Sequence, residues 1–171
     1  MKYKQLELAL AAVHRIDDKG LKTFRARLRH LRNLGVPDVP KPGSGGQVEY
    51  TDEHAHQLVI ALELEAFDWD PAHAADLVKS RWPALKQWCE EARINQGMFL
   101  AMHPDFIGES YPALGRNPEQ GTEAGLGLYT RDQVCSEIVS RAGWDLRRLI
   151  AVNLSDSLRW LHGEIEKAGI K

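Results

Sequence analysis

Apolar residues at steps of three and four dominate the first 94 residues and predict that this part of the chain is helical. The expected helices lie at residues 3–16, 21–34, 52–67 and 70–94. Gly35 and Pro37 end the second helix, because glycine adopts the left-handed conformation readily and proline cannot continue a helix. Thr51 and Asp70 are expected to cap the third and fourth helices. Pro83 is expected to bend or break the last one, since proline has no N–H to donate.

The second half of the chain alternates short strand-like runs with helices. Strands are expected at residues 98–102, 126–129 and 149–154, and helices at residues 130–142 and 155–167. The run 149–154 is the most apolar of the three and is expected to be the central strand. Thr130 and Ser155 are the predicted N-caps of the two helices. Residues 103–125 are rich in glycine and proline and predict a functional or mobile loop.

Composition narrows the class of protein. The chain has 171 residues, of which 43% are hydrophobic and 27% charged, the balance of a globular protein with a core. Apolar runs are too short to span a bilayer, and the first residues lack the apolar segment of a signal peptide. Cys89 and Cys135 are too few for a disulfide framework or a thiolate metal cage. We therefore expect a cytoplasmic protein with no membrane partner.

Charge is distributed unevenly along the chain. Residues 1–47 carry ten Lys and Arg against four Asp and Glu, a formal charge of +6. Since the whole chain carries −2, the remaining residues sum to −8. This asymmetry favours a polyanionic partner for the N-terminal end.

The segment GLKTFRARLRHLRNLGVP, residues 20–37, places its leucines and Phe24 on one face of a helix. An adjoining face carries basic side chains at steps of three, four and three: Lys22, Arg25, Arg29 and Arg32. Such a helix can bury one face and insert the other into the major groove, where Arg pairs with guanine edges or with phosphates. We expect Thr23 and Arg27 to make secondary contacts. The alternative is a solvated basic face without a partner.

A Pro/Gly-rich segment follows this helix and precedes the helix that starts after Thr51. That order is typical of a winged helix-turn-helix, in which the segment forms a hairpin called the wing. The wing residues expected to contact DNA are Lys41, Ser44, Gly45 and Gln47. A flexible linker is the competing interpretation. A phosphate-binding P-loop is excluded, because no Gly-Lys-Ser/Thr follows the glycines.

Three segments of residues 5–82 resemble the MerR family of bacterial transcription regulators. They are residues 28–37, similar to the end of the family's reading helix, residues 46–53, similar to its wing and next helix, and residues 67–71, similar to its inter-helix turn. The resemblance implies a winged helix-turn-helix that binds duplex DNA. The chain departs from the family pattern at Gln47 and Val48 in the wing. Pro83 is also expected to interrupt the helix through which family members pair.

Other constellations do not predict an enzyme. His54 and His56 lie about 200° apart around a helix, so they are poorly placed to share a metal. The remaining histidines have no ligand spacing, and surface or capping roles are expected for them. Ser155-Asp156-Ser157 lacks the glycines of a nucleophile elbow and is better explained as a helix cap. We expect no catalytic residue, cofactor or metal.

The expected fold class is mainly α with a small α/β part. Residues 1–95 would form a winged helix-turn-helix DNA-binding domain, and residues 96–171 a small α/β domain for dimerisation, partner or effector binding. The expected function is sequence-specific transcription regulation of bacterial or prophage type. The protein is expected to be a nucleoid-associated homodimer that binds double-stranded DNA. RNA polymerase or another regulator is a further candidate partner. Two alternatives stay open. One is an architectural, excisionase-like DNA-binding protein, and the other is an adaptor whose basic helix binds an acidic protein.

Overall fold

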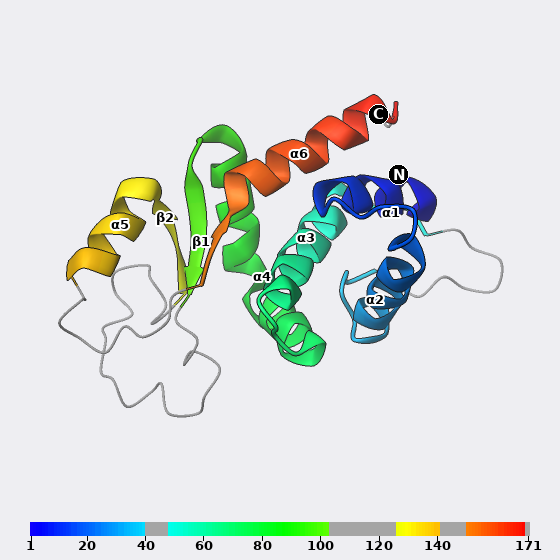
Figure 1. Cartoon of the computed structure of the whole chain (residues 1–171), viewed down its shortest axis with the longest axis horizontal. Coiled ribbons are helices and arrows are strands. Elements are labelled where there is room, and N and C mark those ends of the chain that lie inside the picture. Colours follow the sequence, from blue (N-terminus) through cyan, green and yellow to red (C-terminus); the bar gives the residue numbers. More distant parts are fainter. Residues whose placement is uncertain (40–47, 103–125, 141–149, 170–171) are drawn as a thin grey trace. The chain divides into compact units, whose positions relative to one another are not determined.

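The computed structural model describes residues 1–39, 48–102, 126–140 and 150–169 (Figure 1). These residues are mainly helical and include one three-stranded antiparallel sheet, which confirms the expected fold class at this level. The chain divides into two units. The first comprises Met1–Glu90 together with Ser157–Lys171, and the second comprises Glu91–Asp156. No helix in the described ranges is long and apolar enough to cross a membrane.

Helix α1 spans Tyr3–Val13 and is shorter than the 3–16 expected from its apolar pattern. It ends because Arg15 adopts the left-handed conformation, with φ of 52°. The amide N–H groups of Arg15 and Ile16 then donate to the carbonyls of Ala12 and Ala11, at 3.1 and 2.8 Å. This is a Schellman motif, in which a non-glycine residue occupies the position that usually favours glycine. Apolar periodicity alone does not reveal such an end.

Helix α2 spans Leu21–Asn33 and buries Phe24, Leu28 and Leu31. It ends in a second Schellman motif, in which Gly35 has φ of 87° and Val36 N–H donates to Leu31 O at 2.9 Å. The predicted stop at glycine is therefore confirmed. The bends of the chain bring α1, α2 and α3 into mutual contact, so the buried faces of the three helices share one core.

Helix α3 spans Asp52–Ala66 and is the most buried helix of the first unit. Thr51 caps it as predicted, since its hydroxyl accepts from His54 N–H, and the His54 ring accepts from Thr51 N–H at 3.1 Å. Nine of its residues are buried, so apolar neighbours surround most of its circumference. This position makes α3 the helix against which the others pack.

Helix α4 spans Pro71–Ile94 without interruption, so the expected break at Pro83 was wrong, whereas the alternative of a bend stays a prediction. Pro83 is exposed, and the buried side chains of Val78, Leu85 and Cys89 hold the helix in the core on both sides of it. Packing therefore outweighs the lost N–H and the ring clash. The predicted Asp70 cap is confirmed, because its carboxylate accepts from Ala72 N–H at 2.8 Å. The chain thus contains the long helix that the sequence pattern seemed to exclude.

The second unit contains a sheet in the order β2-β1-β3, all antiparallel. Its strands are β1 (Met98–Met102), β2 (Leu126–Thr130) and β3 (Ile150–Asn153). The expectation that the most apolar run would be central was wrong, because β1 holds that place and β3 pairs with it alone among the described strands. In β1, Leu100 and Ala101 are buried, whereas only Val152 is buried in β3. Helix α5 (Arg131–Ser140) follows the predicted Thr130 cap and packs on β1 and β2.

Helix α6 spans Leu154–Lys167, one residue earlier than expected. Asn153 is its cap, since its side-chain oxygen accepts from Asp156 N–H at 3.2 Å, so the predicted Ser155 cap was wrong. The Ser155 hydroxyl instead donates to Asn95 O at 2.8 Å and accepts from Met98 N–H at 3.0 Å. These bonds tie the start of α6 to the start of β1 within the second unit.

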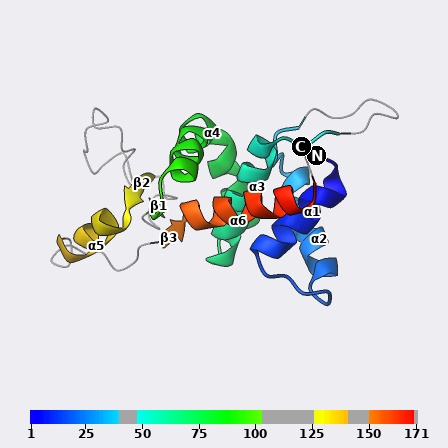
Figure 2. The same cartoon turned by 90° about the horizontal axis from the view of Figure 1, so that it is seen from above.

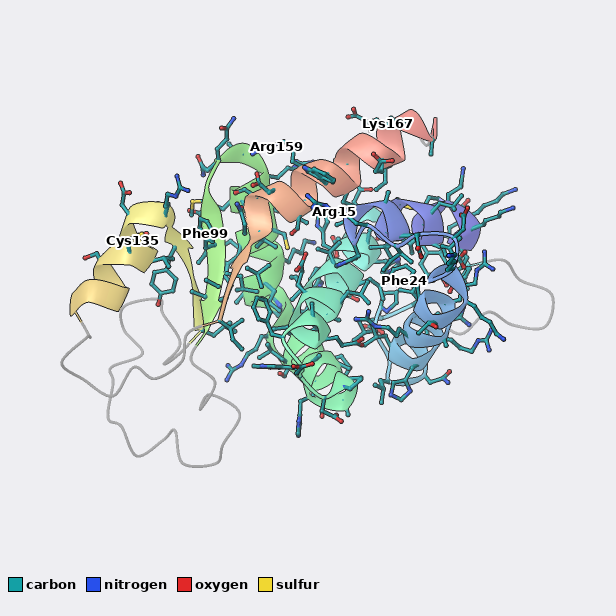
Figure 3. The ribbon with its side chains drawn as sticks, viewed as in Figure 1. Arg15, Phe24, Phe99, Cys135, Arg159 and Lys167 are labelled. Atoms are coloured by element: carbon teal, nitrogen blue, oxygen red, sulfur yellow. The ribbon has the colours of Figure 1, made fainter. Side chains whose placement is uncertain are left out.

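The rest of α6 belongs to the first unit, which differs from the expected 96–171 domain. Figure 2 shows α6 running beside α3 and α1. The Ser157 hydroxyl donates to Glu63 of α3 at 2.9 Å, and the His56 and His162 rings share a hydrogen bond of 3.1 Å. The Arg15 guanidinium lies 5.3 Å above the Trp160 ring (Figure 3). Side chains on α3 and after α1 thus hold the last helix.

Pro83→Ala should stabilise the protein. The substitution restores a donor to the helix and removes the ring clash, while the unfolded chain regains some entropy. We expect a net rise in the free energy of unfolding on the order of 2 kcal/mol. Urea unfolding followed by tryptophan fluorescence measures it. Unchanged or lower stability would show that α4 is deformed at this residue to suit proline.

Candidate nucleic-acid interface

The predicted reading residues lie on α2 as expected from their spacing. Phe24, Leu28 and Leu31 face the core, and Phe24 lies on the side of α2 turned toward its neighbouring helices (Figure 3). The predicted contact residues that are exposed are Lys22, Thr23, Arg25, Arg29 and Arg32, while Arg27 is half-buried. The helix therefore buries one face and presents a cationic one to solvent.

Arg25 binds a carboxylate on the neighbouring helix. Its Nε lies 2.8 Å from Glu7 Oε1 on α1. The Glu7 side chain is only 6% exposed, whereas Arg25 is 51% exposed. A carboxylate in such a place needs a partner, because a buried charge without one is costly. Arg25 therefore joins α2 to α1, while about half of its side chain remains exposed to solvent.

Arg27 makes the corresponding bond to α3. Its Nε lies 2.7 Å from Glu65 Oε2, and the Glu65 side chain is 7% exposed. The other oxygen of Glu65 is buried and has no hydrogen-bond partner among the described residues. Arg27 thus binds a nearly buried carboxylate while its own side chain stays 38% exposed. The structure gives it a role in joining helices, and the secondary DNA contact expected of Arg27 stays a prediction.

Arg32 lies against the start of α1. Its guanidinium carbon is 5.4 Å from the centre of the Tyr3 ring, a cation–π distance. The Tyr3 ring also lies 5.8 Å from the Tyr50 ring, at an angle of 52°. Burial and the nearby Glu7 raise the pKa of Tyr3, while Arg32 and Arg29 act in the opposite direction. Tyr3 therefore lies where the two helices and the segment before α3 meet.

Lys22 and Arg29 are exposed cations of this face for which the described residues provide no ion-pair partner. They are separated by two turns of α2 and share its solvent side. Of the predicted contact residues, these two have the greatest freedom to bind an external anion.

The predicted wing residues Lys41, Ser44, Gly45 and Gln47 lie outside the described residues. Both flanks of that segment are described and anchored. Asp38 N–H donates to the Gln57 side chain of α3 at 2.8 Å, and Tyr50 N–H donates to Met1 O at 2.9 Å. Asp38 therefore lies beside α3, and Tyr50 lies beside the start of α1.

The connection between α1 and α2 runs from His14 to Gly20. The Asp17 carboxylate accepts from Gly20 N–H at 2.8 Å and closes the turn. A Cβ on Gly20 would lie 3.0 Å from Ile16 Cγ2, so this approach favours glycine. The connection is longer than the three or four residues of a compact helix-turn-helix.

His56 is buried and His14 is half-buried, so surface or capping roles describe only some of the histidines. His54 is a cap residue, but His14 and His56 pack inside the first unit. Burial, with a smaller effect of Arg27, lowers the pKa of His14 to about 4. Its Nε2 is buried and has no hydrogen-bond partner in the described ranges. Within those same ranges, no group of three or more His, Cys, Asp or Glu residues could hold a metal ion.

Sequence reasoning missed the acidic partners of the arginines and the role of Tyr3. Glu7 and Glu65 lie 18 and 38 residues from the arginines they bind, so no local spacing links them. One usable signal was present for Glu7, an acid beside Leu6 within an otherwise apolar helical stripe. A carboxylate there predicts a buried charge that requires a cation from elsewhere.

No protein-family model matches this chain, and no curated protein matches it either. The function of the basic face must therefore be inferred from the residues that form it.

Arg25→Ala should destabilise the protein more than Lys22→Ala, although both remove one cation from α2. Losing Arg25 leaves the Glu7 carboxylate buried without a partner, at a cost of about 1–3 kcal/mol. Losing Lys22 should change the free energy of unfolding by less than about 0.5 kcal/mol. Urea unfolding of both variants compares them. Adding Glu7→Leu to Arg25→Ala should recover part of the loss, and equal stability of the two single variants would refute the structural role of Arg25.

Acid should destabilise the first unit through His14. Its folded pKa of about 4 lies below the ordinary value of 6.5, so the unfolded chain binds the proton more readily. Stability from this residue is complete above pH 6.5 and falls toward pH 4, by on the order of 3 kcal/mol. His14→Leu should therefore show a shallower fall in the free energy of unfolding across this window. Identical pH profiles for the variant and the wild type would contradict the assignment.

Proposed function

We propose that this chain is a DNA-binding transcription regulator of bacterial or prophage type, and that the solvent face of α2 binds duplex DNA. The observation that carries the proposal is the row of exposed cations on a helix whose opposite face is buried. Lys22 and Arg29 lie on that face without internal ion pairs in the described part of the chain. Exposed Arg and Lys side chains in such a row suit phosphates and guanine edges.

The anchoring of α2 supports the same proposal. Ion pairs to Glu7 and Glu65 join this helix to α1 and to α3. A helix held on two sides loses little freedom when it binds, so less of the binding free energy is spent on ordering it. Arg25 is suited to both anchoring and binding. Its Nε binds Glu7, while half of its side chain is exposed. We assign it a phosphate-facing role in addition to its structural one.

The proposal extends to a winged helix-turn-helix of MerR-like type, with the wing formed by residues 41–48, and to a nucleoid-associated homodimer. Two copies would place two such helices on neighbouring half-sites of duplex DNA. Joint binding of both half-sites would supply affinity that a single short helix lacks. The second unit would then serve dimerisation, an effector, or a protein partner such as RNA polymerase.

The test is fluorescence-anisotropy binding to a random-sequence duplex over a salt series. We expect wild-type affinity to fall steeply with salt, because bound phosphates release their counterions when cations replace them. Lys22→Ala/Arg29→Ala should weaken binding strongly and make the salt slope less steep by about 2. These two residues are preferred to Arg25, whose loss would also destabilise the helix packing.

The matched control is Arg93→Ala/Lys167→Ala, which removes one Arg and one Lys from exposed positions on α4 and α6. It carries the same change in net charge and should bind nearly as the wild type does. Absence of wild-type binding at low salt would refute the proposal and direct attention to an acidic protein partner. Binding that bends the duplex without changing transcription would instead indicate an architectural, excisionase-like role.

A further inference from the structure

The start of α1 carries a second group of cations beside the proposed DNA-binding face. Lys2 and Lys4 flank Tyr3 in the chain, and both are exposed. Neither forms an ion pair within the ranges that the structure describes. Tyr3 is the residue over which Arg32 of α2 lies, at 5.4 Å. The contact therefore brings the first turn of α1 next to the C-terminal half of α2.

The acidic side chains near the first turn of α1 do not neutralise the cations there. Glu7 already forms an ion pair with Arg25, with 2.8 Å between Oε1 and Nε. Three exposed acids lie on the segments around Tyr50, which are Asp38, Glu49 and Asp52, while Glu53 is bound by Lys86. Against them stand the N-terminal ammonium of Met1 and four side-chain cations at the start of α1 and on α2, which are Lys2, Lys4, Arg29 and Arg32. The corner formed by α1, α2 and Tyr50 therefore carries more positive than negative charge.

The two lysines do not serve the stability of their own helix. Negative side chains are favoured near the start of a helix and positive ones near its end. Helix α1 has no acid in its first turn and instead begins between two lysines. These two cations oppose the helix dipole, remain exposed and have no ion-pair partner among the described residues, and such cations are suited to an external anion.

The rings beneath these cations give the corner a fixed form. Tyr3 contacts Arg32 on one side and lies 5.8 Å from Tyr50 on another. The backbone of Tyr50 bonds to Met1, with Tyr50 N–H donating to Met1 O at 2.9 Å. The aromatic pair and this hydrogen bond hold the first turn of α1 against the segment that leads into α3. The cations therefore extend from an ordered base.

The distance along α2 fits a duplex that crosses both groups. Lys22 and Arg32 are ten residues apart, which is roughly 15 Å along a helix. That length corresponds to about four base pairs of B-form DNA measured along the duplex axis. A backbone that meets Lys22 at one end of α2 can meet the corner at Tyr3 at the other.

We infer that Lys2 and Lys4, with Arg29 and Arg32 beside Tyr3, form a second phosphate-binding site that extends the α2 face onto the start of α1. This inference rests on the proposed DNA binding and adds a contact that the helix-turn-helix pattern does not assign. Its ligand is the phosphodiester backbone of the duplex. Contacts of this kind position a protein on DNA and do not read its sequence.

The experiment is the salt series applied to Lys2→Ala/Lys4→Ala. Each lost lysine–phosphate contact lowers the steepness of log K against log salt by about 1, so we expect the slope to become less steep by about 2. The loss of affinity should be equal on duplexes of unrelated sequence, because phosphate contacts are independent of the bases. Circular dichroism and the urea midpoint check that the variant remains folded.

Lys79→Ala/Lys167→Ala is the matched control. It also removes two lysines, which lie on α4 and α6 in surface ion pairs with Asp76 and Glu164, and it should retain the wild-type slope. An unchanged slope for Lys2→Ala/Lys4→Ala, with Lys22→Ala/Arg29→Ala impaired, would overturn the second site and leave the proposed function standing. Equal slope changes in the control would also overturn it, since net charge alone would then explain the effect. Failure of the wild type to bind DNA would overturn both.

Discussion

The first unit depends on two ion pairs that hold α2 between its neighbours. Glu7 and Glu65 are nearly buried carboxylates on α1 and α3, and each receives one guanidinium from α2. Without those arginines, two negative charges would be left in a low-dielectric environment. The same helix turns its remaining cations to solvent. Helix α2 thus carries two kinds of cation. Arg25 and Arg27 pair with nearly buried carboxylates and stabilise the fold, whereas its other cations have no such carboxylate among the described residues.

The sequence predicted the elements better than their relationships. Six helices and three strands were expected near their observed positions, because apolar periodicity and caps such as Thr51 and Asp70 act within a few residues. The errors have causes beyond that range. Arg15 ends α1 in a conformation that sequence patterns associate with glycine, and packing around Pro83 keeps α4 continuous. The predicted strand order was wrong, because the order depends on how all three strands pair and not on how apolar one strand is.

The position of the candidate site on α2 was predicted from the sequence, but the internal contacts of its arginines were not. The cationic stripe of α2 was visible from spacing, and the structure exposes most of it. Spacing could not separate Arg27 from Arg29, although one binds Glu65 and the other faces solvent. The partner acids lie far away in the chain, so only the folded molecule reveals the division. Tyr3 was missed for the same reason, since its contact with Arg32 joins two helices.

Helix α6 makes the first unit discontinuous in the chain, because residues 91–156 intervene between its two parts. Ser157 and His162 reach Glu63 and His56 of α3 only after this whole intervening segment has been synthesised. During translation, part of the polar surface of α3 therefore stays uncovered while the residues of the sheet are synthesised. Such non-local closure slows folding and prolongs the exposure of incomplete surfaces. The order of synthesis thus makes the helix on which the others pack among the last to be fully enclosed.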